Sequence, residues 1–255
     1  MKRAFAISIL LILSSFNVFA WQIGPDTLLQ NLKGATDFIK ANDAFYIVES
    51  EAHRVIKVDL FGNILETYGN RGSGNYQFDQ PISIASSTGL KIYISDTGNN
   101  RIQVFDKRWQ YLSSIKGNNH FQINTKIDPT HLTVNNLGEV IFYDRRSKSL
   151  AKYDEDGAFL DQIPLASQIK SVSGLQAVSD KIFVLDSKSG FVHRLSENGL
   201  YESFYKAENT ESFLFRGSLF TVNNGKLISF EDGVLASNIN NSKKLILQDK
   251  RIYIL

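Results

Sequence analysis

Apolar and polar residues alternate with a period of two through most of the chain beyond its first twenty residues. Ile56 and Val58 flank Lys57, for example, in a run that is typical of the chain. Such runs of about four to eight residues, rich in Ile, Val, Tyr and Phe and bounded by Gly, Asn, Asp or Ser, predict β-strands. Helical periodicity is almost absent, so the pattern predicts an all-β fold.

One unit of this strand pattern recurs along the chain. It consists of an apolar run, an acidic residue, a short polar loop and a second alternating run. The copies are YIVESEAHRVIKVD at 46–59, IYISDTGNNRIQVFD at 92–106, IFYDRRSKSLAKYD at 141–154 and FVLDSKSGFVHRLS at 183–196, and their acidic residues are Glu49, Asp96, Asp144 and Asp186. Self-similarity at a spacing of tens of residues is typical of repeat architectures.

Each repeat holds four predicted strands, which in the second repeat are 81–86, 91–96, 101–106 and 111–115. The turn between the third and fourth strands marks the register, because a glycine there supplies the positive φ of a tight hairpin. These turn positions are Gly62, Trp109, Gly157, Gly199 and Gly233, spaced by 47, 48, 42 and 34 residues. The spacing predicts five complete repeats.

Both ends of the chain carry parts of one more unit. Residues 244–248 and 251–255 resemble the first two strands of a repeat, and residues 21–33 resemble its last turn and fourth strand. Joining them would close a ring and protect strand edges that otherwise promote aggregation. We therefore predict an all-β, six-bladed β-propeller whose last blade is closed by N- and C-terminal strands.

The first twenty residues have the features of a signal peptide. Lys2 and Arg3 precede an apolar stretch at 4–16, and Val18 and Ala20 in Val18-Phe19-Ala20 supply small residues at the positions that a signal peptidase reads. We predict a signal peptide at 1–20 and a propeller domain at 21–255, with an uncleaved N-terminal anchor as the alternative. No second apolar stretch of spanning length follows, so no transmembrane segment is expected in the mature chain.

Charge and cysteine content limit the class of partner and the cell compartment that can be expected. The chain has 28 basic and 26 acidic residues, and removing Lys2 and Arg3 makes the two numbers equal. Nucleic-acid binders usually carry a basic excess, so no nucleic-acid partner is expected. The chain has no cysteine, so an exported protein of this size must depend on a large core rather than on disulfides. We expect a periplasmic or secreted bacterial protein.

The segment GNRGSGNYQFDQPISIASSTGLKIYISDTGNNRIQVFD at Gly69–Asp106 resembles the NHL-repeat family of six-bladed propellers. The resemblance weakens through 34–69, 129–163 and 173–204. The glycine-rich start is interpreted as a connection between blades, because a phosphate-binding loop would lead into a helix.

The repeated charged positions are interpreted as structural. Asp96 ends a strand, where its carboxylate can accept backbone hydrogen bonds and face Arg101, and Glu49 and Arg54 repeat this spacing. A paired charge at a turn chiefly fixes loop geometry. The next two repeats have Ser149 and Phe191 in place of the arginine.

The central channel holds the candidates for chemistry. Asp37, Ser83 and His131 are expected to project into it from first strands, and Gln176 and Asp249 are weaker candidates. A catalytic metal site needs three protein ligands that converge on one point. The other histidines fall in loops or on a third strand, so they are not expected to converge with His131. No cofactor is therefore expected, although a channel cation near His131 remains an alternative. If no cation binds there, His131 is a channel residue with an ordinary structural role.

Loops on one propeller face offer a binding surface. The second-to-third-strand loops and the blade connections should carry the candidate residues Arg71, Tyr76, His120, Arg145, Arg146 and Lys148. Arginine and aromatic residues are common anchors of protein interfaces, although a solvated polar loop would look the same. Trp109, on the opposite face, is expected to be exposed or to cap a neighbouring hairpin.

We therefore expect a monomeric, non-catalytic, exported NHL-like propeller that binds a protein or glycan partner in the cell envelope. The alternative is a metal-dependent hydrolase or lyase that uses the central channel.

Overall fold

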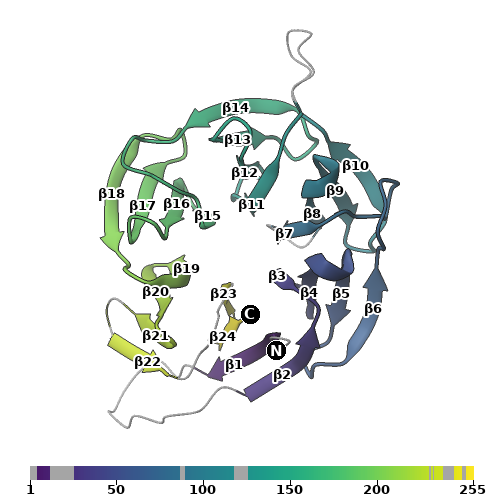
Figure 1. Cartoon of the computed structure of the whole chain (residues 1–255), viewed down its shortest axis with the longest axis horizontal. Helices are drawn as coiled ribbons and strands as arrows, with labels where there is room; N and C mark the ends of the chain where they lie inside the picture. The colour runs from purple at the N-terminus through teal and green to yellow at the C-terminus, as the bar shows by residue number, and fades with distance from the viewer. Residues whose placement is uncertain are drawn as a thin grey trace.

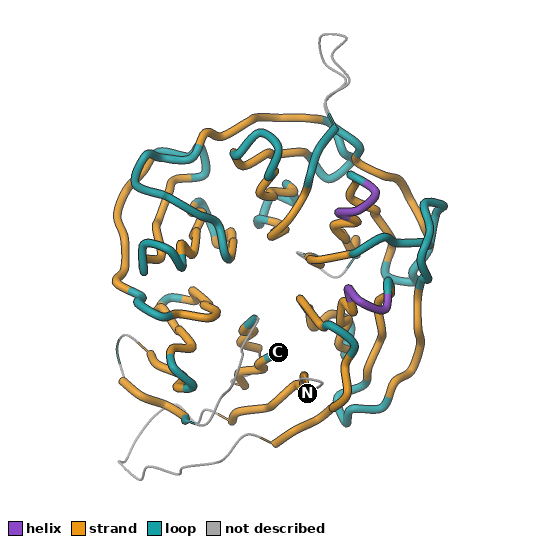
Figure 2. The backbone as a smooth tube through the Cα atoms, viewed as in Figure 1, coloured by secondary structure: helices purple, strands orange, loops and turns teal. Residues whose placement is uncertain are grey.

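The computed structural model describes residues 5–11, 26–86, 90–117, 126–229, 231, 233–237, 244–248 and 251–255. These residues form twenty-four strands and two short 3-10 helices. The strands make four-stranded antiparallel sheets that surround a central opening (Figures 1 and 2). The fold is an all-β propeller, as the alternating pattern predicts. Within the described residues, no helix is both long enough and apolar enough to cross a membrane.

Five blades each take four consecutive strands, counted from the channel outward. Blade 1 comprises β3 (Ala35–Ala41), β4 (Ala44–Glu49), β5 (Arg54–Val58) and β6 (Ile64–Tyr68). Blade 2 comprises β7 (Pro81–Ala85), β8 (Lys91–Asp96), β9 (Arg101–Asp106) and β10 (Tyr111–Ile115). Blade 3 comprises β11 (Pro129–Val134), β12 (Val140–Asp144), β13 (Ser149–Tyr153) and β14 (Phe159–Pro164). Blade 4 comprises β15 (Gly174–Val178), β16 (Lys181–Asp186), β17 (Phe191–Ser196) and β18 (Tyr201–Lys206). Blade 5 comprises β19 (Thr210–Arg216), β20 (Ser218–Asn223), β21 (Lys226–Ser229) and β22 (Gly233–Ala236). The 3-10 helices η1 (Ser50–Ala52) and η2 (Thr97–Asn99) lie in second-to-third-strand loops.

The predicted number of six blades is wrong, because five blades are built from repeats. The ends of the chain form a composite sheet instead, in the order β2 (Asp26–Leu32), β1 (Phe5–Leu11), β24 (Arg251–Ile254), β23 (Leu245–Gln248). Its second strand, β1, comes from the segment predicted to be a signal peptide. The expected split blade would have used only residues of the mature chain.

Apolar side chains fill the spaces between neighbouring blades. The middle strands are almost wholly buried, as in β4, whereas the outer strand β6 is largely exposed. One cluster joins Ile39 and Val48 of blade 1 to Ile84 and Phe105 of blade 2. This gradient explains why the inner strands read as apolar runs and the outer strands as alternating ones.

Trp109 belongs to this interface between blades 1 and 2. It is only 4% exposed and stacks on Tyr68 and Phe105. Of the two sequence-based alternatives, exposure is therefore wrong, and the indole caps the neighbouring blade.

Candidate binding face and central channel

Loops of two kinds meet on one side of the propeller, which we call the loop face. Its parts are the second-to-third-strand loops and the connections between blades. Backbone hydrogen bonds join them: Gly98 N–H donates to the Asp79 carbonyl at 2.8 Å, and Arg145 N–H donates to the Asp128 carbonyl at 3.1 Å. The turns within the first-to-second and third-to-fourth hairpins form the opposite face. Each blade connection is therefore tied to the loop of the blade that follows it.

In four of the five repeat-built blades, an acidic side chain at the end of the second strand reinforces this tie. In blades 1 to 4 it accepts a hydrogen bond from a backbone N–H located 16 or 17 residues earlier. The pairs are Lys33 N with Glu49 (2.5 Å), Asp79 N with Asp96 (2.7 Å), Asp128 N with Asp144 (2.8 Å) and Lys170 N with Asp186 (2.7 Å). The carboxylate thus holds the connection that leads into its own blade. We call the carboxylate and the groups that donate hydrogen bonds to it the clamp of that blade.

Blade 5 has a clamp that sequence reasoning missed. Asn223 occupies the acidic position, and its side-chain amide donates to the Glu208 carbonyl. An amide serves here because the group it contacts is an acceptor rather than a backbone N–H. The only sequence signal was its place at the end of the second strand.

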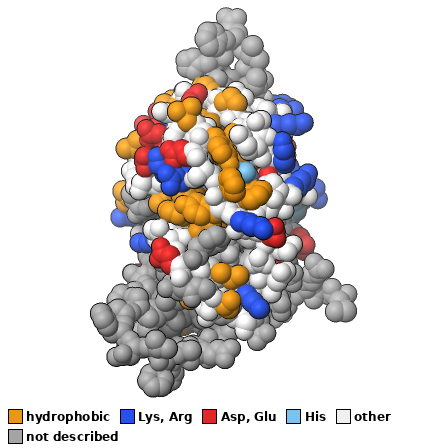
Figure 3. Space-filling view, turned by 90° about the vertical axis from the view of Figure 1, so that its left-hand side faces the viewer, with side chains coloured by type: hydrophobic (Ala, Val, Ile, Leu, Met, Phe, Trp, Pro, Cys, Tyr) orange, Lys and Arg blue, Asp and Glu red, His pale blue; other side chains and the backbone are white. Residues whose placement is uncertain are grey.

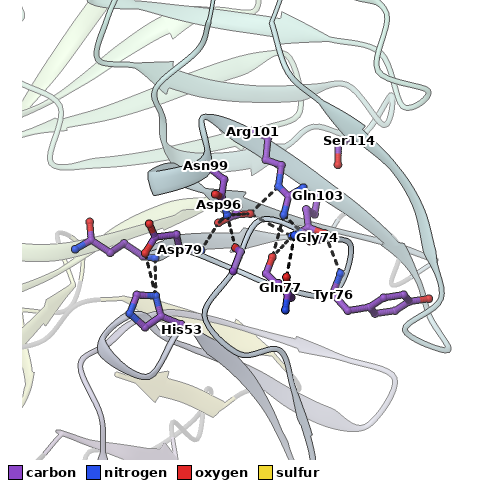
Figure 4. Close-up of polar contacts among 12 residues, drawn as sticks. His53, Gly74, Tyr76, Gln77, Asp79, Asp96, Asn99, Arg101, Gln103 and Ser114 are labelled. Atoms are coloured by element: carbon purple, nitrogen blue, oxygen red, sulfur yellow. Dashed lines mark hydrogen bonds and ion pairs between the residues drawn. The ribbon is translucent and has the colours of Figure 1, made fainter.

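The clamp is most elaborate in blade 2 (Figure 4). Arg101 Nε donates to Asp96 Oδ2 at 2.7 Å, and its guanidinium also donates to the carbonyls of Gly74 (2.7 Å) and Gln77 (3.0 Å). Gln103 Nε2 donates to the Gln77 carbonyl at 2.6 Å. Asn99 Nδ2 donates to the Gly72 carbonyl at 2.8 Å. The glycine-rich connection 69–80 is therefore held in one conformation by buried polar groups.

The other clamps differ in which groups stabilise the negative charge of the carboxylate. In blade 1, Arg54 Nε lies 2.5 Å from Glu49 Oε2. In blade 4, burial tends to raise the pKa of Asp186, but hydrogen bonds from Ser171, Lys170 N and Ser189 outweigh it and lower that pKa to about 2. Hydrogen-bond donors can thus replace the arginine, which explains why the later repeats tolerate its loss.

The predicted binding residues do not form one cluster. Arg71 lies in the connection before blade 2, where its Nε is 3.6 Å from Asp79 Oδ1. Tyr76, from the same connection, turns to the rim, and its hydroxyl accepts a hydrogen bond from Tyr111 N–H at 2.9 Å. Both are separated along the ring from the loop of blade 3. His120 lies outside the described residues.

The loop of blade 3 carries the other three predicted residues. Arg145 makes a two-pronged contact with Asp128, at 3.1 Å and 2.9 Å. Arg146 reaches the Asn100 amide oxygen of blade 2 at 3.4 Å. Lys148 is exposed with a φ of 53°. This loop therefore presents cations on a backbone that the Asp144 clamp holds in place.

Sequence reasoning missed further cations of the same surface. Five exposed basic side chains over blades 3 and 4 face no carboxylate among the described residues: Lys126, Arg146, Lys148, Lys170 and Lys188. We call this set the basic patch. Lys and Arg side chains gather along the right-hand edge of the space-filling view (Figure 3). Arg146 and Lys148 were among the residues predicted from the sequence. Lys126, Lys170 and Lys188 come from other loops, and no local charge run indicated them.

The central channel is a cavity of about 1030 Å³, and its lining includes Asp37, Ser83 and His131. The Asp37 carboxylate accepts hydrogen bonds from Ser83 Oγ at 2.6 Å and from Ile84 N–H at 3.0 Å. Lys244 Nζ lies 2.7 Å from its other oxygen. Asp37 is therefore engaged in joining blade 1 to blade 2 and to the composite sheet.

Polar side chains continue this stitching around the channel. Ser83 Oγ accepts from Leu132 N–H at 2.9 Å, and Thr133 Oγ1 accepts from Ala177 N–H at 3.0 Å. Gln176 exchanges hydrogen bonds with the Phe215 backbone, at 2.7 Å and 3.2 Å. Asp249 lies outside the described residues. These channel groups mainly connect neighbouring first strands.

His131 lies at a bulge rather than in the position expected from its alignment with Ser83. Thr130 takes the paired position, and His131 is the extra residue, with a φ of 48°. Burial lowers the pKa of His131 to about 4, while Asp37 opposes the shift and Lys244 and Arg145 add to it. Within the described residues, no three His, Asp or Glu side chains are grouped to hold a metal ion.

Comparison with known sequences agrees with the repeat. A family model described as NHL repeat matches residues 78–105, which run from the end of the first connection through β9. NHL repeat-containing protein 3 of Homo sapiens is 33% identical over 73 residues, or 28% of this chain and 21% of that protein. The chain thus spans about a fifth of the length of this relative.

Comparison with solved structures shows the fold. A chain of a nidogen/laminin complex has a TM-score of 0.62 at 14% identity, with 88% of this chain and 89% of that chain covered. An inactive virginiamycin B lyase from Staphylococcus aureus with quinupristin has a TM-score of 0.59 at 12% identity (94% and 78%). U3-55K has a TM-score of 0.61 at 12% identity, with 77% of this chain and 60% of that chain covered. These likenesses show the fold alone, and the chain is a β-propeller that carries an NHL repeat.

Proposed function

We propose that this chain is a non-catalytic propeller that binds a protein partner through the basic patch on its loop face. The observation that carries the proposal is the set of cations over blades 3 and 4 that have no carboxylate partner among the described residues. An acidic surface on the partner would complete these charges and speed the encounter.

The rigidity of the loops supports a binding role. The Asp144 and Asp186 clamps hold the backbone of Arg146, Lys170 and Lys188 by direct hydrogen bonds. Side chains on fixed loops lose less conformational freedom on binding, so more of the contact free energy remains as affinity. A chain of similar fold occurs in a complex of nidogen and laminin, which is a complex between proteins.

The setting is part of the proposal. The signal-peptide features of residues 1–20 support an exported protein that works in the cell envelope. An anionic glycan offers the same charge as an acidic protein, and it is the competing outcome of the test below.

The channel enzyme is less well supported. A cation bound by Asp37 would have to compete with Lys244 Nζ at 2.7 Å and with two hydrogen-bond donors of blade 2. His131 is neutral near pH 7, because burial lowers its pKa to about 4, but among the described residues no other histidine lines the channel.

The test is affinity capture from an envelope extract with the tagged chain and with its Arg146→Glu, Lys148→Glu variant. The matched control is Lys107→Glu, Arg108→Glu, which reverses two exposed charges on the opposite face. We expect an acidic protein that the wild type and the control retain and the variant loses. Retention that is equal in all three, or loss of a glycan rather than a protein, would contradict the proposal.

A further inference from the structure

Two aromatic side chains lie against each other at the rim of blade 4, beside the basic patch. The ring centroids of Phe191 and Phe204 are 4.8 Å apart, with the rings nearly perpendicular. Phe204 is 57% exposed. In the strand register, Phe191 pairs with Asp186 on one side and with Lys206 on the other, so it lies at the loop-face end of the blade. We call Phe191 and Phe204 the aromatic pair.

Comparison with blade 2 shows why this pair is open. Phe191 occupies the position of Arg101, and Phe204 occupies that of Ser114. In blade 2 the connection 69–80 lies over these positions, because Arg101 and Gln103 hold the carbonyls of Gly74 and Gln77. The connection before blade 4 is shorter, 165–173. It keeps the backbone hydrogen bond to the acid of its blade, from Lys170 N to Asp186, and Ser171 Oγ donates to the same carboxylate. Phe191 therefore replaces an arginine that in blade 2 holds the connection.

Asp186, which lies opposite Phe191 in the strand register, also brings two lysines to this end of the blade. The backbone N–H groups of Lys170 and Lys188 donate to the same carboxylate, Asp186, at 2.7 Å and 3.1 Å, so the two side chains start close together. Lys206 is the cross-strand neighbour of Phe191, and its ammonium lies 3.0 Å from the exposed Glu208. In Figure 3, hydrophobic side chains form a patch on this side of the molecule, with Lys and Arg beside them.

We propose that the aromatic pair and Lys170 and Lys188 together form a docking site for an acidic peptide segment of the partner. An aromatic or leucine side chain of the peptide packs on Phe191 and Phe204, and its carboxylates face the two lysines. An aromatic anchor supplies most of the binding free energy, and the charges fix its register. This inference rests on the proposed function, because it places the partner on the same loop face.

The test is selection of a displayed random-peptide library on the full chain. Enriched peptides are then synthesised with a fluorescent label and titrated by anisotropy. We expect sequences with acidic residues around one aromatic or leucine residue, and a loss of affinity of roughly tenfold or more with Phe204→Ser. Phe61→Ser is the matched control, since Phe61 is 83% exposed on the opposite face and should leave affinity unchanged. Lys170→Glu, Lys188→Glu should weaken the same peptides, and less so at high salt.

The outcomes separate this inference from the proposed function. Acidic peptides that lose affinity with Arg146→Glu, Lys148→Glu but not with Phe204→Ser would overturn the docking site and leave the basic patch as the binding surface. Peptides without acidic residues, or insensitive to both sets of variants, would overturn both. Phe204→Ser must keep the wild-type thermal melting curve, which its exposure leads us to expect.

Discussion

Trp109 lies flat on Tyr68 of the preceding blade, with ring centroids 4.0 Å apart and planes 19° from parallel. It does so at the turn position where the next two blades have Gly157 and Gly199. The equivalent outer-strand contacts of those glycines are Ile115 and Ile163. A flat aromatic partner leaves room for an indole where a branched aliphatic one leaves room only for glycine.

The stack at Trp109 should contribute strongly to stability. We expect Trp109→Gly to lower the free energy of unfolding by about 3 kcal/mol, because it empties a buried aromatic site. Trp109→Phe should cost much less, since it keeps the stacking, and the indole N–H has no hydrogen-bond partner among the described residues. Urea unfolding followed by far-UV circular dichroism measures both. Equal losses for the two variants would show that stacking is not the cause.

Glycine at the next turns should be intolerant of a side chain to different degrees. A Cβ at position 199 would lie 2.1 Å from Ile163 Cγ2, whereas one at 157 would lie 3.2 Å from Ile115 Cγ1. Both residues have positive φ, which costs an alanine about 1 kcal/mol. We therefore expect Gly199→Ala to destabilise clearly more than Gly157→Ala in urea unfolding. In a double-mutant cycle, Ile163→Ala should remove part of the extra cost at position 199.

Removing the carboxylate should cost different amounts of protein stability in different blades, depending on which groups stabilise its charge. Asp96→Ala leaves Arg101, which is 4% exposed, without its carboxylate, so we expect a loss of about 3–5 kcal/mol. Asp144→Ala removes hydrogen bonds from Asp128 N, Arg146 N and Ser147 Oγ but strands no buried arginine. Its expected cost is about 1–3 kcal/mol. Chemical denaturation of the two variants decides the order, and the reverse order would contradict the role assigned to Arg101.

Two histidines, His131 in the channel and His193 on β17, should make the free energy of unfolding fall on mild acidification. Burial lowers the pKa of His131 from 6.5 to about 4, and burial also lowers the pKa of His193. Between about pH 6.5 and pH 4 the unfolded chain binds more protons than the folded one, so the free energy of unfolding falls as pH falls. The contribution is complete above pH 6.5. Urea midpoints across this range should vary less in His131→Gln than in the wild type.

Asp186 should act in a separate, lower pH window. Its folded-state pKa of about 2 lies below its ordinary 3.8, because the hydrogen bonds of the clamp outweigh burial. The stabilisation that it supplies is complete above pH 3.8 and is lost as pH falls toward 2. Asp186→Asn should therefore flatten the acid limb of the stability curve below pH 3.8. Because the Asp186 carboxylate lies 3.8 Å from His193 and opposes the lowering of the His193 pKa, the same variant should steepen the fall in stability in the histidine window.

Local pattern predicted the blades well because each blade is local in sequence. Period-two alternation, turn glycines and the acidic residue after the second strand lie within one repeat, and they located β7 to β18. What failed depends on distant contacts. Trp109 is buried through a ring on another blade, and His131 is displaced by a bulge that its neighbours do not announce. The basic patch combines loops of different repeats, so the stretch 145–148 indicated only Arg146 and Lys148 and not the other three cations.

The composite sheet gives the most direct test of how the ring is closed. In it β1 pairs on both sides: Ile9 lies opposite Asp26 of β2 and opposite Tyr253 of β24. A chain that begins at Trp21 lacks this strand and leaves β2 and β24 without their partner. Two unpaired edges should destabilise the fold by a few kcal/mol, which corresponds to about 5–10 °C in melting temperature for a chain of this size. Calorimetry of the full chain and of the chain from Trp21 measures the difference. The intact mass of the protein recovered from its native host shows which form is used. If processing occurs and the melting temperature is unchanged, β2 must pair with β24 directly, and the propeller closes without β1. If the shorter chain melts lower, residues 5–11 serve as a strand of the fold and not only as a targeting segment.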